Sequence, residues 1–331
     1  MGETRGRVPH VLLLALIQGV LSSSTVEVLP SENPACAGNM VTLTLSPATQ
    51  LQSGSWAVGG TQILTWSGGQ QAVFPSHNGR ASVNVSTGTL TLTSITVADS
   101  GVFVVQSTSP QLTATSTLTV LEPVSALRLV ANNTGNLVEF KSSVSLFCSS
   151  SGSSLSYRWL NGNSEVTASD GIQLGDGNST LTIVNVTRYN DGPFRCNAFN
   201  AVSNGTTEPL HLNISYGPDG VSFTVNRLNT TTSFLIGSTL TMSCSAQSNP
   251  QAEFQWAFNG KHLNGTSPDL KLYSAVESQS GLYSCLAFNN RTMSNSNVTR
   301  QITISSGSVS VQLGVSVWLV LLLSSLAGVL F

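Results

Sequence analysis

Two copies of one cysteine–tryptophan–cysteine pattern constrain the fold of this chain more than any other feature. In each copy the tryptophan follows the first cysteine by 11 or 12 residues, and the second cysteine closes a loop of 48 or 41 residues. A disulfide that joins two facing β-sheets, with a tryptophan packed against it, requires such a spacing. The pattern therefore predicts two disulfides, each inside its own β-sandwich: Cys148–Cys196 around Trp159, and Cys244–Cys285 around Trp256.

The residues around these cysteines carry the alternation of half-buried strands. Apolar residues alternate with serine or threonine over residues 240–244, and Val144, Leu146 and Cys148 occupy every second position in the same way. An aromatic residue, Phe194 or Tyr283, precedes each second cysteine by two positions, where immunoglobulin-like domains place a tyrosine whose hydroxyl closes a corner. Phe194 has no hydroxyl for that bond. Both copies nevertheless predict immunoglobulin-like sandwiches.

A third copy precedes these two and lacks the cysteines. The run from Asp99 to Val105 repeats the frame of the later strands, with Val105 at the position of the second cysteine. Leu43 lies 13 residues before Trp56, at the position of the first cysteine. We therefore expect Leu43 and Val105 to fill the core in place of a disulfide.

Two further residues of this first copy leave alternatives open. Arg80 lies 19 residues before Asp99, so it either forms the ion pair that closes the end of variable-type domains or remains a solvated loop charge. Cys36 has no partner in the pattern, so it is either a small packed hydrophobe or the site of an intermolecular disulfide.

The two ends of the chain differ from the middle. Arg5 and Arg7 precede the apolar run Val11–Leu21, which predicts a secretory signal peptide cleaved before Thr25. A small-residue cluster around Ser306 precedes an apolar terminus with no charged residue, which is typical of a glycosylphosphatidylinositol (GPI) attachment signal. The alternative is a transmembrane helix without a cytoplasmic tail.

The expected architecture is all-β, with three tandem immunoglobulin-like sandwiches, one variable-type and two constant-type, on the external face of the plasma membrane. The expected boundaries are 1–24 for the signal peptide, 25–121, 122–216 and 217–304 for the sandwiches, and 305–331 for the anchor, with Ser306 as the attachment residue.

Composition excludes several classes of function. Only 8% of the residues are charged, against about 25% in a typical soluble domain, and the net charge is −2. This chain therefore offers no basic field for nucleic acid. The histidines after the signal peptide are scattered among the sandwiches, and no metal-ligand cluster, phosphate loop or nucleophile elbow is present. We predict neither an enzyme nor a bound cofactor.

Acceptor sequences for N-linked carbohydrate are distributed unevenly over the three sandwiches. The three sandwiches contain one, five and four acceptors, so sugar is expected to coat the second and third sandwiches and to leave the first nearly bare. The single site of the first sandwich, Asn84, is expected on the sheet opposite the one that contains Trp56. The acceptors are Asn84, Asn132, Asn178, Asn185, Asn204, Asn213, Asn229, Asn264, Asn290 and Asn297.

Several stretches resemble a known family. The run from Gly175 to Arg188, and the segments from Trp256 to Gly260 and from Ser280 to Asn289, resemble constant-type domains of the carcinoembryonic-antigen-related cell adhesion molecules. The stretch from Gly68 to Arg80 resembles the N-terminal variable-type domain of that family, which also lacks the disulfide.

This resemblance implies adhesion, to a second copy or to related immunoglobulin-family proteins, through the outer face of one sheet of the first sandwich. That sheet is expected to contain strand C around Trp56, strand C′ from Gln62 to Trp66, strand F around Val105, and the strand G that follows it. Ala57 stands where the family has a tyrosine, and Trp66 has the alternative of folding inward as a second core aromatic. A receptor for a soluble or microbial ligand that does not self-associate is the competing function. The residues expected on the adhesive face are Ser55, Ala57, Gln62, Leu64, Trp66, Val104, Gln106 and Thr108.

Overall fold

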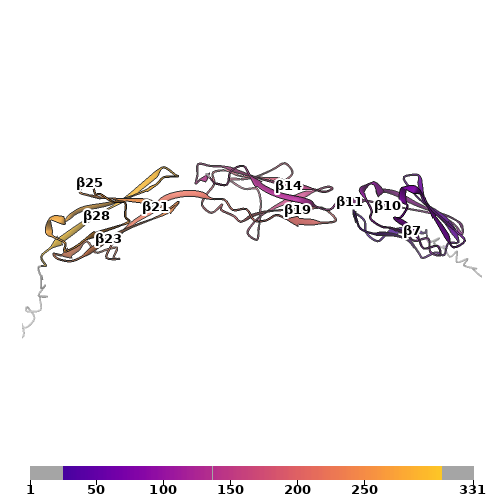
Figure 1. Cartoon of the computed structure of the whole chain (residues 1–331), viewed down its shortest axis with the longest axis horizontal. Helices are drawn as coiled ribbons and strands as arrows, with labels where there is room; N and C mark the ends of the chain where they lie inside the picture. The colour runs from indigo at the N-terminus through magenta and orange to yellow at the C-terminus, as the bar shows by residue number, and fades with distance from the viewer. Residues whose placement is uncertain (1–24, 136, 308–331) are drawn as a thin grey trace, which may run out of the picture. The chain divides into compact units, whose positions relative to one another are not determined.

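The computed structural model describes residues 25–135 and 137–307, and their regular elements are almost all strands (Figure 1). The helices in this part of the chain are short 3-10 turns, and none is long or apolar enough to cross a membrane. The predicted signal peptide and the apolar terminus from residue 308 onward lie outside the described residues. The 3-10 turns are η1 (Pro75–His77), η2 (Val97–Asp99) and η3 (Glu277–Gln279).

The chain divides into two compact units. Unit 1 contains the residues up to 128 together with 149–157 and 197–206, and unit 2 contains 129–148, 158–196 and the residues from 207 onward. The boundaries of the three predicted sandwiches therefore stay a prediction.

Residues 25–121 form a four-stranded sheet of order β1-β3-β8-β7, a five-stranded sheet of order β10-β9-β4-β5-β6, and a short parallel pair of β2 with β11. The strands are β1 (Glu27–Pro30), β2 (Ala35–Cys36), β3 (Val41–Ser46), β4 (Ser53–Val58), β5 (Thr61–Ser67), β6 (Gln70–Val73), β7 (Ala81–Val83), β8 (Leu90–Leu92), β9 (Gly101–Ser109), β10 (Gln111–Leu118) and β11 (Val120–Leu121).

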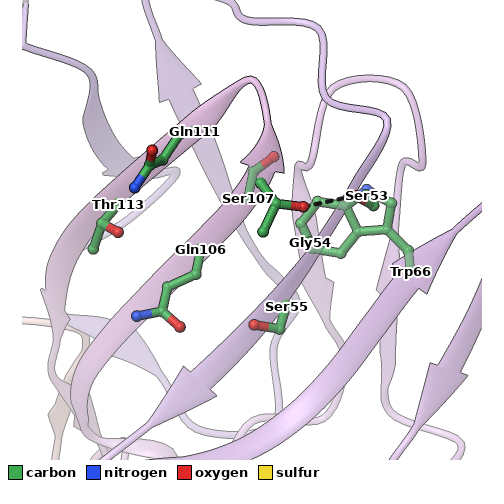
Figure 2. Close-up of a pocket in the computed structure, with 9 residues that line it drawn as sticks. Ser53, Gly54, Ser55, Trp66, Gln106, Ser107, Gln111 and Thr113 are labelled. Carbon is green, nitrogen blue, oxygen red and sulfur yellow. Dashed lines mark hydrogen bonds between the residues drawn. The ribbon is translucent and has the colours of Figure 1, made fainter.

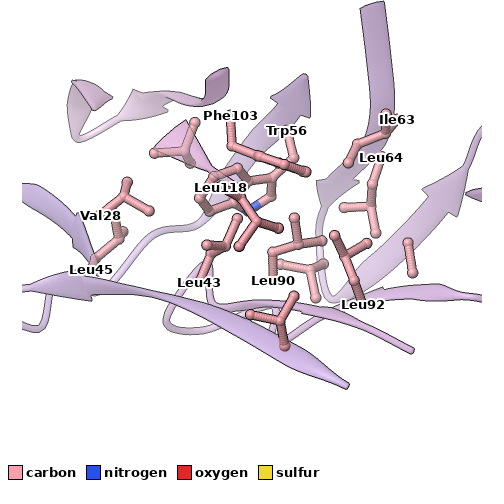
Figure 3. Packing of buried hydrophobic residues seen from close by; sticks show 14 of the residues in the cluster. Val28, Leu43, Leu45, Trp56, Ile63, Leu64, Leu90, Leu92, Phe103 and Leu118 are labelled. Atoms are coloured by element: carbon pink, nitrogen blue, oxygen red, sulfur yellow. The ribbon is translucent and has the colours of Figure 1, made fainter. Parts of the chain in front are cut away.

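One hydrophobic cluster fills the space between these two sheets. Leu43 and Val105 are both fully buried in it, so the predicted apolar replacement of the disulfide is confirmed. Figure 3 shows Leu43 and Leu90 facing Trp56 and Phe103 across the interior.

Residues 125–206 contribute two sheets, of order β12-β14-β18-β17 and β16-β15-β19-β20. Their strands are β12 (Ser125–Ala131), β14 (Val144–Ser151), β15 (Ser156–Asn161), β16 (Ser164–Val166), β17 (Ile172–Gly175), β18 (Thr180–Ile183), β19 (Phe194–Phe199) and β20 (Asn204–Thr206).

The residues from 214 onward, together with β13 from the preceding range, contribute a sheet of order β13-β21-β23-β26 and a sheet of order β22-β28-β27-β24-β25, which enclose a second hydrophobic cluster. Their strands are β13 (Leu137–Val138), β21 (Ile214–Val225), β22 (Ser233–Leu235), β23 (Leu240–Asn249), β24 (Glu253–Phe258), β25 (Lys261–His262), β26 (Asp269–Leu272), β27 (Gly281–Asn289) and β28 (Ser294–Ser305).

Both predicted disulfides are present, Cys148–Cys196 and Cys244–Cys285. The Tyr283 hydroxyl donates to the backbone oxygen of Gln279 at 2.9 Å, which is the expected tyrosine corner. Cys36 is a free, half-buried cysteine on β2, so the choice between packing and an intermolecular bond stays open.

Each core tryptophan is fixed by the same bond. Its indole N–H donates to a backbone carbonyl in or next to a loop of the facing sheet, so the bond crosses the sandwich. The pairs are Trp56 Nε1 to Gly88 O at 2.9 Å, Trp159 Nε1 to Asn178 O at 2.7 Å, and Trp256 Nε1 to Ser267 O at 3.2 Å.

The predicted ion pair of Arg80 with Asp99 is present. Two guanidinium nitrogens of Arg80 each donate to one carboxylate oxygen of Asp99 at 2.9 Å, and Asp99 is 3% exposed. Burial opposes ionisation, but the bonds from Arg80 and from Thr96 outweigh it and hold the pKa of Asp99 below its usual value. His77 lies beside this pair, with its Nε2 3.3 Å from the carboxylate, and burial lowers the pKa of His77.

Reducing agent and a core mutation should act on different parts of the chain. Reduction removes about 4 kcal/mol from each disulfide-bonded sandwich on the chain-entropy model, but residues 25–121 contain no disulfide to lose. Amide exchange measured by mass spectrometry should therefore accelerate in β14 and β23 and stay unchanged in β3. Leu43→Ala should do the reverse, with a loss of about 2–5 kcal/mol in β3. Faster amide exchange in β3 of the reduced, unmutated chain would contradict the conclusion that residues 25–121 are stable without a disulfide.

The ion pair should also make residues 25–121 sensitive to acid. The unfolded chain protonates the Asp99 carboxylate at a higher pH than the folded chain does. The stabilisation is therefore complete above about pH 4 and is lost as the pH falls through the folded value. Asp99→Asn should cost about 3 kcal/mol at pH 7 and remove this acid-dependent loss. Exchange of β8 and β9 amides at pH 7 and pH 3 measures both effects, with the exposed carboxylate variant Glu27→Gln as the control.

Candidate functional site

The candidate site is the outward face of the sheet β10-β9-β4-β5-β6. Trp56 on β4 and Phe103 and Val105 on β9 are fully buried, so the alternate residues of these strands point outward. The strand register arranges the outward side chains in two rows that cross the sheet. The first row is Thr113, Gln106, Ser55, Thr65 and Ala72, and the second is Thr115, Val104, Ala57 and Gln62.

Most of the residues expected on this face lie on it. Their adhesive role stays a prediction. Gln62, Gln106 and Thr108 are exposed, and Ser55, Ala57 and Val104 are half-buried.

The expectation for Leu64 and Trp66 is wrong, because both point into the core. Leu64 is fully buried and Trp66 is 2% exposed. The cause is a bulge in β5: Trp56 pairs with Leu64 and Ala57 pairs with Gln62, so Ile63 is an extra residue. Because of this extra residue, Leu64 and Trp66 point into the core, although simple alternation from the outward Gln62 predicts that they point outward. The alternative of Trp66 as a second core aromatic is therefore the one that the structure adopts.

Gly54 makes room for the indole of Trp66. The two residues are direct cross-strand partners, and a Cβ atom on Gly54 would lie 2.5 Å from Trp66 Cη2 and 2.5 Å from the backbone oxygen of Gln106. Any side chain larger than hydrogen would therefore collide with the ring. A glycine opposite a tryptophan was the sequence signal for this arrangement, and strand alternation alone does not reveal it.

A second irregularity opens a hollow beside Gly54. Ser53 pairs with Ser109 and Ser55 pairs with Gln106, so β9 carries one extra residue against β4. The hollow has a volume of about 630 Å³, with hydroxyl and carboxamide groups around it and Trp66 at its edge (Figure 2). Its lining residues are Ser53, Gly54, Ser55, Trp66, Gln106, Ser107, Thr108, Gln111 and Thr113.

No charged side chain belongs to this face. The sequences of β4, β5, β6, β9 and β10 contain no Lys, Arg, Asp or Glu. Across the described residues no group of three or more His, Cys, Asp or Glu is placed to hold a metal ion. This face can therefore bind through hydrogen bonds and apolar contacts but not through ion pairs.

The acceptor asparagine of this part of the chain lies away from the face. Asn84 is exposed in the turn between β7 and β8, which belong to the other sheet. Its Oδ1 accepts bonds from the backbone N–H and hydroxyl of Ser86. Carbohydrate on Asn84 would project from the opposite side of the sandwich.

Adding one methyl group at Gly54 should disturb the site from within. Gly54→Ala forces Trp66 or the Gln106 backbone to move, so we expect a loss of about 1–3 kcal/mol and a shift in tryptophan fluorescence. The neighbouring change Ser55→Ala removes only a half-buried hydroxyl and should leave both quantities nearly unchanged. Thermal unfolding followed by fluorescence tests the pair, and equal stability of the two variants would show that Trp66 does not need the space at Gly54.

Comparison with known proteins finds immunoglobulin domains in this chain. Family models described as "Immunoglobulin domain" match residues 128–200 and 224–304. The mouse protein named cell adhesion molecule CEACAM16 is 26% identical over 306 residues, which cover 88% of this chain and 71% of the relative.

A solved structure of three immunoglobulin domains supports the fold. The full ectodomain of mouse nectin-like molecule 4 is 18% identical, with a TM-score of 0.58 over 83% of this chain and 98% of that one. Murine CEACAM1b is 27% identical, with a TM-score of 0.48 over 57% of this chain and 98% of that one. The chain thus contains immunoglobulin domains and is similar to a carcinoembryonic-antigen-related cell adhesion molecule.

Proposed function

We propose that this protein is a cell-surface glycoprotein that mediates cell–cell adhesion or recognition through the outward face of β10-β9-β4-β5-β6. The partner is a second copy of the chain or a related immunoglobulin-family protein. The observation that carries the proposal is the face itself, which is broad, uncharged and free of acceptor asparagines, with Gln62 and Gln106 exposed on it. The name of the mouse relative, a cell adhesion molecule, supports the same function.

The chemistry of the face suits a partner of the same kind. A charged partner would lose the hydration of its ions on contact and find no counter-charge here. Carboxamide and hydroxyl groups both donate and accept hydrogen bonds, so a row of Gln, Ser and Thr is complementary to a copy of itself. Many weak contacts between two apposed membranes add through avidity.

The rest of the chain is proposed as an exported, sugar-coated stalk. In this arrangement three sandwiches, 25–121, 122–216 and 217–304, follow the signal peptide 1–24. Every acceptor asparagine from Asn84 to Asn297 is exposed, as glycosylation requires. The anchor would be a GPI group on Ser306, which is also exposed, or a transmembrane helix in the apolar terminus.

The competing function is a receptor for a soluble or microbial ligand that does not self-associate. The hollow beside Gly54 favours this alternative, because a concave, polar depression suits a small inserted group better than a flat sheet does. The same side chains would serve both functions, so an experiment on self-association separates them.

Suspension cells that produce the full chain should clump, and Gln62→Ala and Gln106→Ala should each reduce clumping by about tenfold, since each removes hydrogen bonds at the centre of the face. Thr44→Ala, an exposed change on the opposite sheet, is the matched control and should have no effect. Surface staining must show equal amounts of every variant.

Cells that display the chain and remain dispersed would reject self-adhesion in favour of the receptor function. Clumping that both glutamine variants retain in full would place the adhesive surface elsewhere.

A further inference from the structure

The sheet β22-β28-β27-β24-β25 presents an apolar strip on its outward face. We define this strip as Leu286 and Phe288, which are half-buried on β27 and point away from the core. Leu286 lies between Gln255 and Asn297 in the register, so the polar neighbours flank the strip rather than cover it. An outward leucine and phenylalanine side by side leave apolar surface in contact with water.

An acceptor asparagine stands directly beside this strip. Asn297 on β28 is the cross-strand partner of Leu286 and is exposed. Its neighbour Val298 packs against the core, so the side chain of Asn297 points to the outer face. Thr299, which completes the acceptor sequence, bonds through its hydroxyl to Ser284 at 2.8 Å on that same face.

The geometry brings a sugar on Asn297 over the strip. Cross-strand partners have Cβ atoms about 5 Å apart, so the first sugar ring attached to Asn297 Nδ2 begins within contact distance of Leu286. Leu286 and Phe288 also line a hollow of about 310 Å³ together with Gln255 and Asn295. A pyranose ring has one face of C–H groups, which can lie on the apolar side chains while its hydroxyls remain in water.

The sheet of residues 25–121 gives the contrast. Its outward rows contain Ser, Thr, Gln, Ala and Val, with no acceptor asparagine on any of its strands. The sheet with the more apolar face is therefore the one that carries the attachment site.

We propose that the carbohydrate on Asn297 packs over Leu286 and Phe288 and closes this sheet face to other proteins. The chain's own sugar is thus the occupant of the apolar strip. The inference rests on the proposed export of the chain, because N-linked carbohydrate is added only in the secretory pathway. It does not depend on self-adhesion, so the clumping experiment and the one below can fail separately.

Hydroxyl-radical labelling of the full chain, purified from secreting mammalian cells, measures the exposure of individual side chains. Asn297→Gln and Thr299→Ala each abolish the acceptor sequence, one at the asparagine and the other at the threonine. Each substitution should raise the labelling of Leu286 and Phe288 by about threefold, because the covering sugar is lost. Thr299→Ser keeps the acceptor sequence and should label like the parent chain. Tyr273, which is 72% exposed and follows β26 of the facing sheet, is the internal reference and should not change.

Asn264→Gln removes a different sugar from the loop between β25 and β26 and is the matched control for the loss of carbohydrate in general. Mass spectrometry of the peptide that contains residue 297 reports whether the site is occupied. An unoccupied Asn297 in the parent chain overturns the proposal. So does an occupied site whose removal leaves the labelling of the strip at the parental level.

Discussion

The bond from a core tryptophan to the facing sheet is the interaction on which the rest of this structure depends. A buried indole N–H without an acceptor costs free energy, and a bond to a carbonyl removes that cost. Trp56, Trp159 and Trp256 each find that carbonyl in or beside a loop of the opposite sheet. The bond thus fixes the ring, the loop and the separation of the two sheets together. It is present around Trp56, where no disulfide links the sheets, so the cross-link adds to this arrangement and does not create it.

Once the interior is fixed in this way, the outer faces can differ without disturbing the fold. The face of β10-β9-β4-β5-β6 has no charge and no acceptor asparagine, whereas the face of β22-β28-β27-β24-β25 has an apolar strip and Asn297 beside it. The positions that differ point to solvent, so their substitution costs little stability. The proposed division into one binding face and one covered face follows from residues that the core does not constrain.

The sequence predicts what depends on spacing and misses what depends on an inserted residue. The cysteine–tryptophan spacing identifies both disulfides, and the repeated frame around Val105 identifies a core without one. The same reasoning fails at β5, because Ile63 adds one residue to the strand and reverses the direction of Leu64 and Trp66. The bulge cannot be detected from the apolar alternation, since Ile63 and Leu64 are both apolar and either of them could be the residue that faces the core. The compensating feature is local: Gly54 offers the space that Trp66 occupies.

The absence of ions from the proposed binding face has a kinetic consequence. Opposite charges accelerate the diffusional encounter of two proteins by long-range attraction, and dissolved ions weaken that attraction. Two faces without charged side chains do not attract each other in this way. Their association rate constant therefore stays at the slow basal value at every ionic strength. The orientation and the time for docking must then come from confinement between two neighbouring cells, and a copy released into free solution would seldom find a partner.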